Sequence, residues 1–164
     1  MKTSIVKSLG TAAVACVALT GCSLVAPVAT QMSYNASDGV SVAADSVNVR
    51  NLLLVGDEKG VFNVVFTAVN NADSSALIHF DFLSTDGATA HAHFMVEPGT
   101  TRTGNLAEGD PVEVVELPGQ AIGSTVQAVV TVNGVETELS VPVLDGTLPE
   151  YKPYIVTAEE AAKH

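Results

Sequence analysis

Three histidines, an aspartate and a methionine follow one another at short spacing in the middle of this chain: His79, Asp81, His91, His93 and Met95. Imidazole nitrogens suit zinc and copper, and a thioether adds a preference for Cu(I). A copper or zinc site formed by these five residues is therefore one interpretation of the pattern. The alternative is a polar sheet face on which histidine pairs with aspartate across two strands.

A β-hairpin would bring these side chains together. Two segments that alternate polar and apolar residues flank a turn that ends at Gly87. If Gly87 takes the left-handed position of a three-residue loop, His79 lies opposite His93 and Asp81 lies opposite His91. This register places the phenylalanines of both segments on the other face. The opposed Cβ atoms would then lie about 4.5–5.5 Å apart, close enough for two side chains to approach one ion.

The rest of the body consists of short β-branched runs separated by Gly, Pro, Asn and Asp. Asn133-Gly134, between two alternating runs, is the strongest hairpin signal in the chain. This spacing of strands favours an all-β fold, an antiparallel β-sandwich of immunoglobulin-like or cupredoxin-like kind. The expected strands cover residues 47–55, 61–69, 77–83, 89–96, 101–106, 112–116, 125–132 and 135–143.

The sequence has no further pattern that is typical of catalysis. It contains no Gly-x-Ser-x-Gly elbow, no phosphate-binding loop and no His-Glu-x-x-His motif. Its two cysteines, Cys16 and Cys22, lie near the N-terminus, so the body has no thiol for catalysis, redox exchange or zinc binding. We therefore expect a protein that is not an enzyme and has no cofactor, unless copper or zinc occupies the histidine group.

The N-terminus is typical of a bacterial lipoprotein. Two lysines precede an uncharged stretch, which ends at Leu19-Thr20-Gly21-Cys22. That stretch is too short to span a bilayer, which needs about 20 apolar residues, but it fits the apolar region of a signal peptide. The tetrapeptide looks like a lipobox, in which cleavage leaves an acylated cysteine, for example with palmitate, as the first residue. We predict lipidation of Cys22; an ordinary signal peptide cleaved elsewhere is the alternative.

These features divide the chain into four parts. We expect a signal peptide at 1–21, a lipidated tether at 22–38, the sandwich at 39–145 and a C-terminal tail at 146–164. Removal of the signal peptide would leave five Lys and Arg against 18 Asp and Glu, a net charge of −13. Nucleic acid and anionic lipid repel such a chain, so acyl chains alone would hold it at the extracytoplasmic face of the cell membrane. Cationic proteins or metal ions are its expected charged partners.

The tail differs in composition from the sandwich. Its two prolines favour an extended run over 148–154. Thr157 and Glu160 have the spacing of a capping box, which could open one short helical turn. A frayed terminus is the alternative. A tail of this kind could also lie along a partner protein, with contacts made by Tyr151, Pro153 and Tyr154.

One segment of the tether and several of the sandwich resemble one protein family. Residues 28–31, 47–55 and 66–71, followed by Asp73 and Leu77, are similar to the LpqE-type lipoproteins of actinobacteria. The resemblance covers most of residues 28–145 and is one of pattern. It implies an immunoglobulin-like or cupredoxin-like sandwich on the outer face of the cell membrane. For some members it also implies a peripheral subunit of the actinobacterial cytochrome bcc–cytochrome c oxidase supercomplex.

A more distant resemblance, carried by residues 68–77 and 141–143, is to the periplasmic copper chaperones that supply the oxidase. Their copper motif combines a His, a Met further along the chain and then His-x-Met. Here Arg102 or Gly104 occupies the position expected for that Met, and no His-x-Met follows. The copper site of the chaperones is therefore not carried over to this chain.

Three functions follow from these expectations. The first is a non-catalytic accessory subunit that stabilises or assembles the respiratory supercomplex from the periplasmic side, in contact with cytochrome bcc and oxidase subunits. The second is a copper-binding chaperone for the oxidase. The third is a cell-envelope binding lipoprotein unrelated to respiration.

Overall fold

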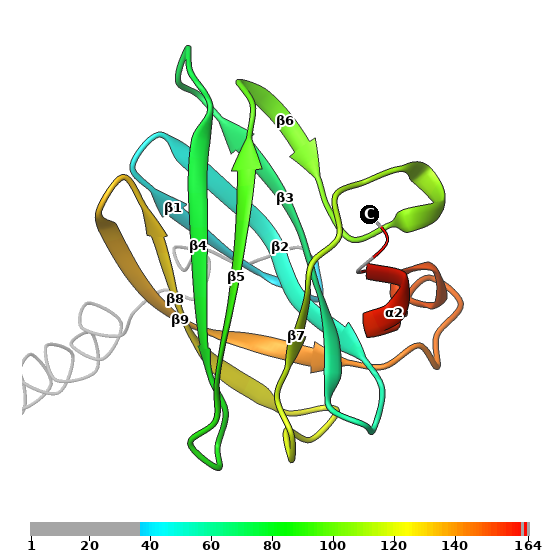
Figure 1. Ribbon diagram of the computed structural model, residues 1–164. Helices are drawn as coiled ribbons and strands as arrows, with labels where there is room; N and C mark the ends of the chain where they lie inside the picture. The colour runs from blue at the N-terminus through cyan, green and yellow to red at the C-terminus, as the bar shows by residue number, and fades with distance from the viewer. Residues whose placement is uncertain (1–36, 162, 164) are drawn as a thin grey trace, which may run out of the picture. The chain divides into compact units, whose positions relative to one another are not determined.

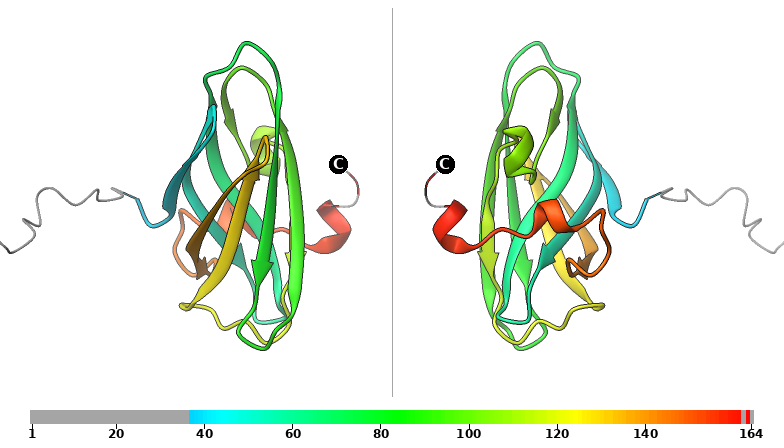
Figure 2. Two further views of the ribbon diagram at one scale, coloured as in Figure 1. Left: turned by 90° about the vertical axis from the view of Figure 1, so that its left-hand side faces the viewer. Right: turned by 90° about the vertical axis from the view of Figure 1, so that its right-hand side faces the viewer.

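Two layers of β-strands make up the part of the chain that the computed structural model describes, residues 37–161 and 163. One layer has the strand order β5-β4-β8-β9, and the other contains β1, β2, β3, β6 and β7 (Figures 1 and 2). The predicted all-β, sandwich-like fold is confirmed. The strands are β1 (Val40–Ala44), β2 (Val47–Gly56), β3 (Val61–Asn70), β4 (Ala76–Leu83), β5 (Thr89–Val96), β6 (Gly99–Arg102), β7 (Val114–Glu116), β8 (Thr125–Val132) and β9 (Val135–Leu144).

The two layers join through β9. This strand pairs antiparallel with β8 as far as Pro142, and its last two residues then pair parallel with Leu54 and Val55 of β2. The other strand pairs are antiparallel. The nine strands therefore form one curled, mixed sheet, which is antiparallel as predicted except at this single pairing.

The hydrophobic core lies between the two layers. Phe66 of β3 crosses it, with its ring centroid 5.1 Å from Phe80 of β4 and 4.9 Å from Phe94 of β5. Burial alternates residue by residue along β4 and β5, as expected for strands with one face on the core and one in water. This alternation sends the polar residues of both strands to the outer face.

Both predicted hairpin turns are present. Gly87 has a φ of 89°, and the Ser84 N–H donates to the Ala88 carbonyl at 2.8 Å, which closes the β4–β5 turn. Asn133 and Gly134 have φ values of 50° and 80° between β8 and β9. A two-residue type I′ turn requires positive φ at both positions, and this requirement explains the Asn-Gly pair.

The region between β5 and β8 differs from the prediction. β6 ends at Arg102, because Gly104 has a φ of 99° and turns the chain. A short 3₁₀ helix, η2 (Leu106–Glu108), follows, and the Asn105 side chain caps it by accepting from the Ala107 N–H at 3.2 Å. β7 begins two residues later than predicted. β1, which pairs with the first half of β2, was not predicted from the sequence.

The C-terminal segment packs against the outer side of β2 and β3. On that side Leu53, Val55 and Val65 face away from the core but are buried. Three partly buried side chains pack against them: Leu144, Tyr151 and Tyr154. The prediction of an extended run over 148–154 was wrong, since a turn and a 3₁₀ helix, η3 (Lys152–Tyr154), occupy it. A compact turn lets both tyrosines reach the same apolar patch.

A single helical turn follows this segment, as the capping-box spacing predicts. It is α2 (Ala158–Ala161), at the red end of the ribbon in Figure 1. The Thr157 N–H donates to Glu160 Oε2 at 3.0 Å, and the Glu160 N–H donates to Thr157 Oγ1 at 3.2 Å. These reciprocal bonds satisfy two backbone donors at the start of the helix.

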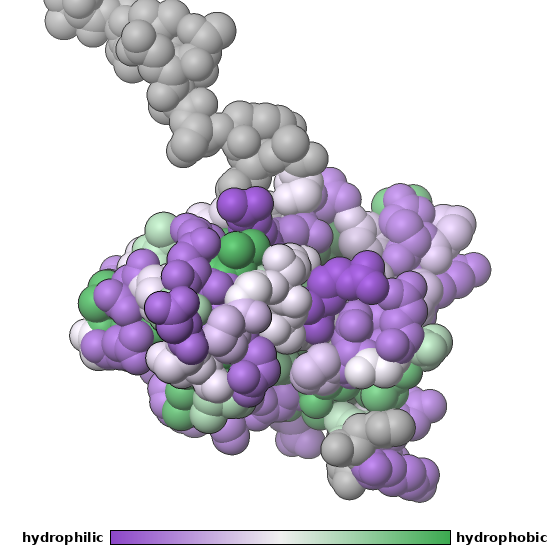
Figure 3. Space-filling view, turned by 90° about the horizontal axis from the view of Figure 1, so that it is seen from above, coloured by the Kyte–Doolittle hydropathy of each residue, from purple (hydrophilic) through white to green (hydrophobic). Residues whose placement is uncertain are grey.

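Figure 3 views the molecule from above and shows that this side of the described residues is mainly hydrophilic, with small separate hydrophobic areas. Within the described ranges, no helix has the length and apolar character needed to cross a membrane. The predicted signal peptide at 1–21, Cys22 and the tether up to residue 36 lie outside the described residues.

Candidate functional site

The exposed face of the β5-β4-β8-β9 layer carries the predicted histidines. His79 and Asp81 reach it from β4, and His91 and His93 reach it from β5. His79 lies directly opposite His93, and Asp81 lies directly opposite His91. The register predicted from the turn at Gly87 is therefore confirmed.

Asp81 and His91 form a close pair on this face. Asp81 Oδ1 lies 2.6 Å from His91 Nδ1, and the two side chains are 52% and 70% exposed. The distance fits a proton on Nδ1 that is donated to the carboxylate. Because both groups are in water, such a pair contributes no more than about 1 kcal/mol to stability.

His93 is linked to a residue outside the hairpin, Glu113. The His93 backbone N–H donates to Glu113 Oε2 at 2.9 Å, and its Nδ1 lies 3.5 Å from Glu113 Oε1. β5 is the last strand of its layer, so Glu113 satisfies an N–H that an edge strand would leave open. The His79 ring lies on the other side of His93, with 6.3 Å between ring centroids.

The predicted metal ligands are neighbours in the structure but do not converge on one point. In the described part of the chain, no group of three or more His, Cys, Asp or Glu is placed to hold a metal ion. Asp81 turns to His91 and Glu113 to His93, while Met95 is 59% exposed and lies opposite Leu77. Metal binding stays a prediction that would require side chains to rotate.

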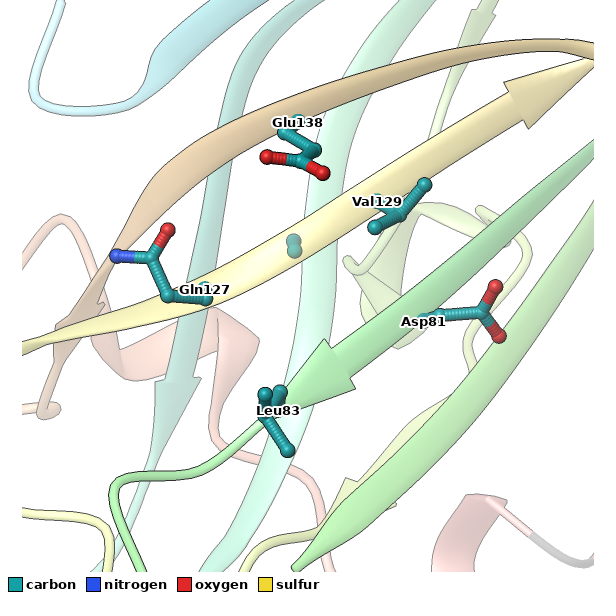
Figure 4. Close-up of a pocket in the computed structure, with 6 residues that line it drawn as sticks. Asp81, Leu83, Gln127, Val129 and Glu138 are labelled. Carbon is teal, nitrogen blue, oxygen red and sulfur yellow. The ribbon is translucent and has the colours of Figure 1, made fainter. Parts of the chain in front are cut away.

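The same face is hollowed over β8, next to the histidine pairs. The hollow has a volume of about 260 Å³ and opens to solvent. Figure 4 shows side chains from β4, β8 and β9 around it. We call it the β8 hollow, and it is lined by Asp81, Leu83, Gln127, Ala128, Val129 and Glu138.

The strand register explains how the β8 hollow is built. Asp81 on β4, Val129 on β8 and Glu138 on β9 lie in one row across the sheet. Val129 is only half-buried, and Leu83 at the end of β4 is 49% exposed. The hollow therefore has an apolar floor with Glu138 on one side, and the carboxylate of Asp81 on the other side turns away towards His91 (Figure 4).

This face carries negative charge without basic residues. None of the strands β4, β5, β8 and β9 contains Lys or Arg. Glu136 and Glu138 point outward from β9, and neither takes part in an ion pair within residues 37–161 and 163. Histidines are the only cationic candidates that β4 and β5 bring to the face.

The predicted partner-binding residues of the tail lie elsewhere, on the outer side of β2 and β3. Pro153 is exposed, whereas Tyr151 and Tyr154 are half-buried against the chain's own sheet. Partner binding by these three residues stays a prediction. Their packing shows, however, that both tyrosines serve first to hold the tail in place.

Asn63 of β3 holds the tail by a hydrogen bond from its side chain. Its side chain is completely buried, and Nδ2 donates to the carbonyls of Gly104 at 2.8 Å and Tyr154 at 2.9 Å. One amide thus joins β3, the turn after β6 and the C-terminal segment. The sequence alone gave no sign of this role, because a polar residue in a strand is usually assigned to the solvent side.

Tyr151 is held at its other end by Asp38, the residue at which the predicted tether ends. The Tyr151 hydroxyl donates to Asp38 Oδ2. Partial burial of the ring, the hydrogen bond to Asp38 and the charge of that carboxylate raise the pKa of Tyr151 to about 12. The first described residues and the C-terminal segment are therefore in direct contact.

Sequence reasoning missed the residues of the β8 hollow other than Asp81. Glu138 and Val129 carry a detectable signal, since both occupy outward positions in strands whose register follows from Asn133-Gly134. Glu113 carries none, because its contact with His93 depends on how β7 approaches the edge of β5.

Comparison of the chain with protein-family models gives no match, and comparison with curated proteins likewise gives none.

Proposed function

We propose that this chain is a non-catalytic, lipid-anchored accessory subunit of the actinobacterial respiratory supercomplex, docked on its periplasmic side. In this proposal Cys22 carries the acyl chains, and the sandwich contacts cytochrome bcc and oxidase subunits. The role needs no reacting group. It needs an anchored body with a face suited to protein contact.

The observation that carries the proposal is the outer face of the β5-β4-β8-β9 layer. Its four strands contain no Lys or Arg, and the face is hollowed beside Asp81 and Glu138. Long-range attraction between such a face and a basic protein surface speeds encounter and fixes orientation. The resemblance to the LpqE-type lipoproteins supports the choice of partner.

Co-purification tests the proposal. The oxidase is purified by affinity in mild detergent from cells that contain the chain, and its subunits are quantified. We expect the chain at near-stoichiometric yield. Its absence from the purified complex would rule the accessory role out and would favour a cell-envelope binding lipoprotein.

The anchor is tested separately with Cys22→Ser. Metabolic labelling with a fatty acid should mark the wild-type chain and leave the variant unlabelled and released from the membrane. Label that persists in Cys22→Ser, or a wild-type chain without label, would contradict lipidation at this cysteine.

A copper-binding chaperone is the second candidate, favoured by the opposed rings of His79 and His93. Titration of Cu(I) or Zn(II) should then give an affinity that falls about tenfold or more in His93→Ala. Equal, weak affinities in the wild type and in His93→Ala would exclude this candidate. Normal copper content of the oxidase in a deletion strain would also argue against it.

A further inference from the structure

We propose that the β8 hollow binds an arginine side chain presented by a basic segment of a partner protein. The proposal rests on the proposed accessory function for its setting, and it adds where the contact is made and which chemistry the partner supplies. The hollow lies beside the histidine pairs and includes only one residue of the predicted metal group, Asp81.

The first argument is the width of the row that crosses the hollow. Asp81, Val129 and Glu138 lie on three successive strands, so the outer two are separated by two strand spacings. At about 4.8 Å per spacing, the two carboxylate-bearing positions are about 9–10 Å apart. Asp81 turns towards His91, so a guanidinium group above Val129 donates to Glu138, and the Asp81 carboxylate adds negative charge beside the hollow.

The lining of the hollow argues against a metal ion as the occupant. Calcium takes about six to eight oxygen ligands, whereas the hollow offers two carboxylates, and in the described residues no three His, Cys, Asp or Glu are placed to hold an ion. A carboxylate beside an apolar floor suits a long side chain that ends in a cationic donor group.

The second argument is the apolar floor. Leu83 is 49% exposed, and Val129 is half-buried between the two acidic residues. The methylene stem of arginine can cover these side chains while its charged end stays near the carboxylates. An apolar residue next to that arginine in the partner would contact Leu83 at the edge of the hollow.

The third argument is the charge that this face leaves unpaired. Glu138 has no ion-pair partner within the described residues, and Asp81 has a second oxygen beyond the one that faces His91. The four strands supply no Lys or Arg to either carboxylate. This arrangement repels anionic lipid and attracts a basic segment of a protein.

A labelled peptide with two Leu-Arg repeats tests the proposal against the full chain, purified in neutral detergent. Fluorescence anisotropy should show saturable binding that weakens about two- to fivefold in Glu138→Gln, the ratio that corresponds to an exposed ion pair. Glu150→Gln is the matched control, because it removes the same charge from the segment packed on β2 and β3. Replacing arginine by uncharged citrulline in the peptide should abolish binding.

Salt provides an independent readout. Raising ionic strength from about 0.01 M to about 1 M shortens the screening length from about 30 Å to about 3 Å and should remove most of the binding. The proposal is overturned if the peptide does not bind, if citrulline serves as well as arginine, or if Glu150→Gln weakens binding as much as Glu138→Gln. Peptide binding without co-purification of the oxidase would instead remove only the proposed function.

Discussion

Asn63→Ala is the most informative perturbation of the fold, because a single buried amide joins three parts of the chain. Its Nδ2 donates to Gly104 and Tyr154, and its side chain is completely buried. Two neutral hydrogen bonds contribute about 2 kcal/mol in total, and the carbonyls left without a donor, one buried and one part-buried, add roughly 1 kcal/mol more.

An unsatisfied acceptor on Asn63 itself reduces the expected loss of stability. Asn63 Oδ1 is buried and has no hydrogen-bond partner, so the wild-type side chain already carries an unsatisfied acceptor. Removing it recovers on the order of 1 kcal/mol. We therefore expect Asn63→Ala to lower the free energy of unfolding by about 2 kcal/mol. Asn63→Asp should cost more, because it loses the donor and buries a charge.

Urea unfolding measures the effect. Tyrosine fluorescence reports on the tail, which contains two of the chain's three tyrosines, and far-ultraviolet circular dichroism reports on the strands. With a urea dependence of about 1–3 kcal/mol per M, a loss of about 2 kcal/mol lowers the midpoint by about 0.7–2 M. Asn71→Ala is the control, since this exposed amide also donates to a backbone carbonyl, that of Ser46 at 3.2 Å. Equal midpoint shifts in Asn63→Ala and Asn71→Ala would refute the reasoning.

Two further predictions concern the core and the tail. Phe66→Ala should lower the free energy of unfolding by about 3–5 kcal/mol, because the Phe66 ring is only 2% exposed and packs on Phe80 and Phe94 across the layers. A loss below about 1 kcal/mol in chemical denaturation would contradict that packing. Tyr151 should titrate with a pKa of about 12 against an ordinary value of 10, in an absorbance titration that Tyr151→Phe simplifies by one group. Because the folded-state pKa is raised, the stability that the Tyr151–Asp38 contact adds is complete below pH 10 and is lost as pH rises towards 12; a transition at the ordinary pH would show that the contact does not form in solution.

The sequence was sufficient for features that depend on local chemistry. Alternation along β4 and β5 determined which side chains face the core, since successive residues of a strand point to opposite sides. Gly87 and the Asn133-Gly134 pair determined their turns, because few residues tolerate positive φ. Together these features determine that His79 lies opposite His93.

Only the tertiary structure decided what covers the outer side of β2 and β3. Val55 and Val65 alternate with core residues and would face water in an isolated sandwich, yet the C-terminal segment buries them. Its compact turn at Tyr151 overrode the extended preference of the prolines, because burial of two aromatic rings outweighs a local backbone bias. The contacts of Glu113 with His93, and the row formed by Asp81, Val129 and Glu138, likewise depend on which strands become neighbours. Strand order joins residues far apart in the chain, and no local preference encodes it.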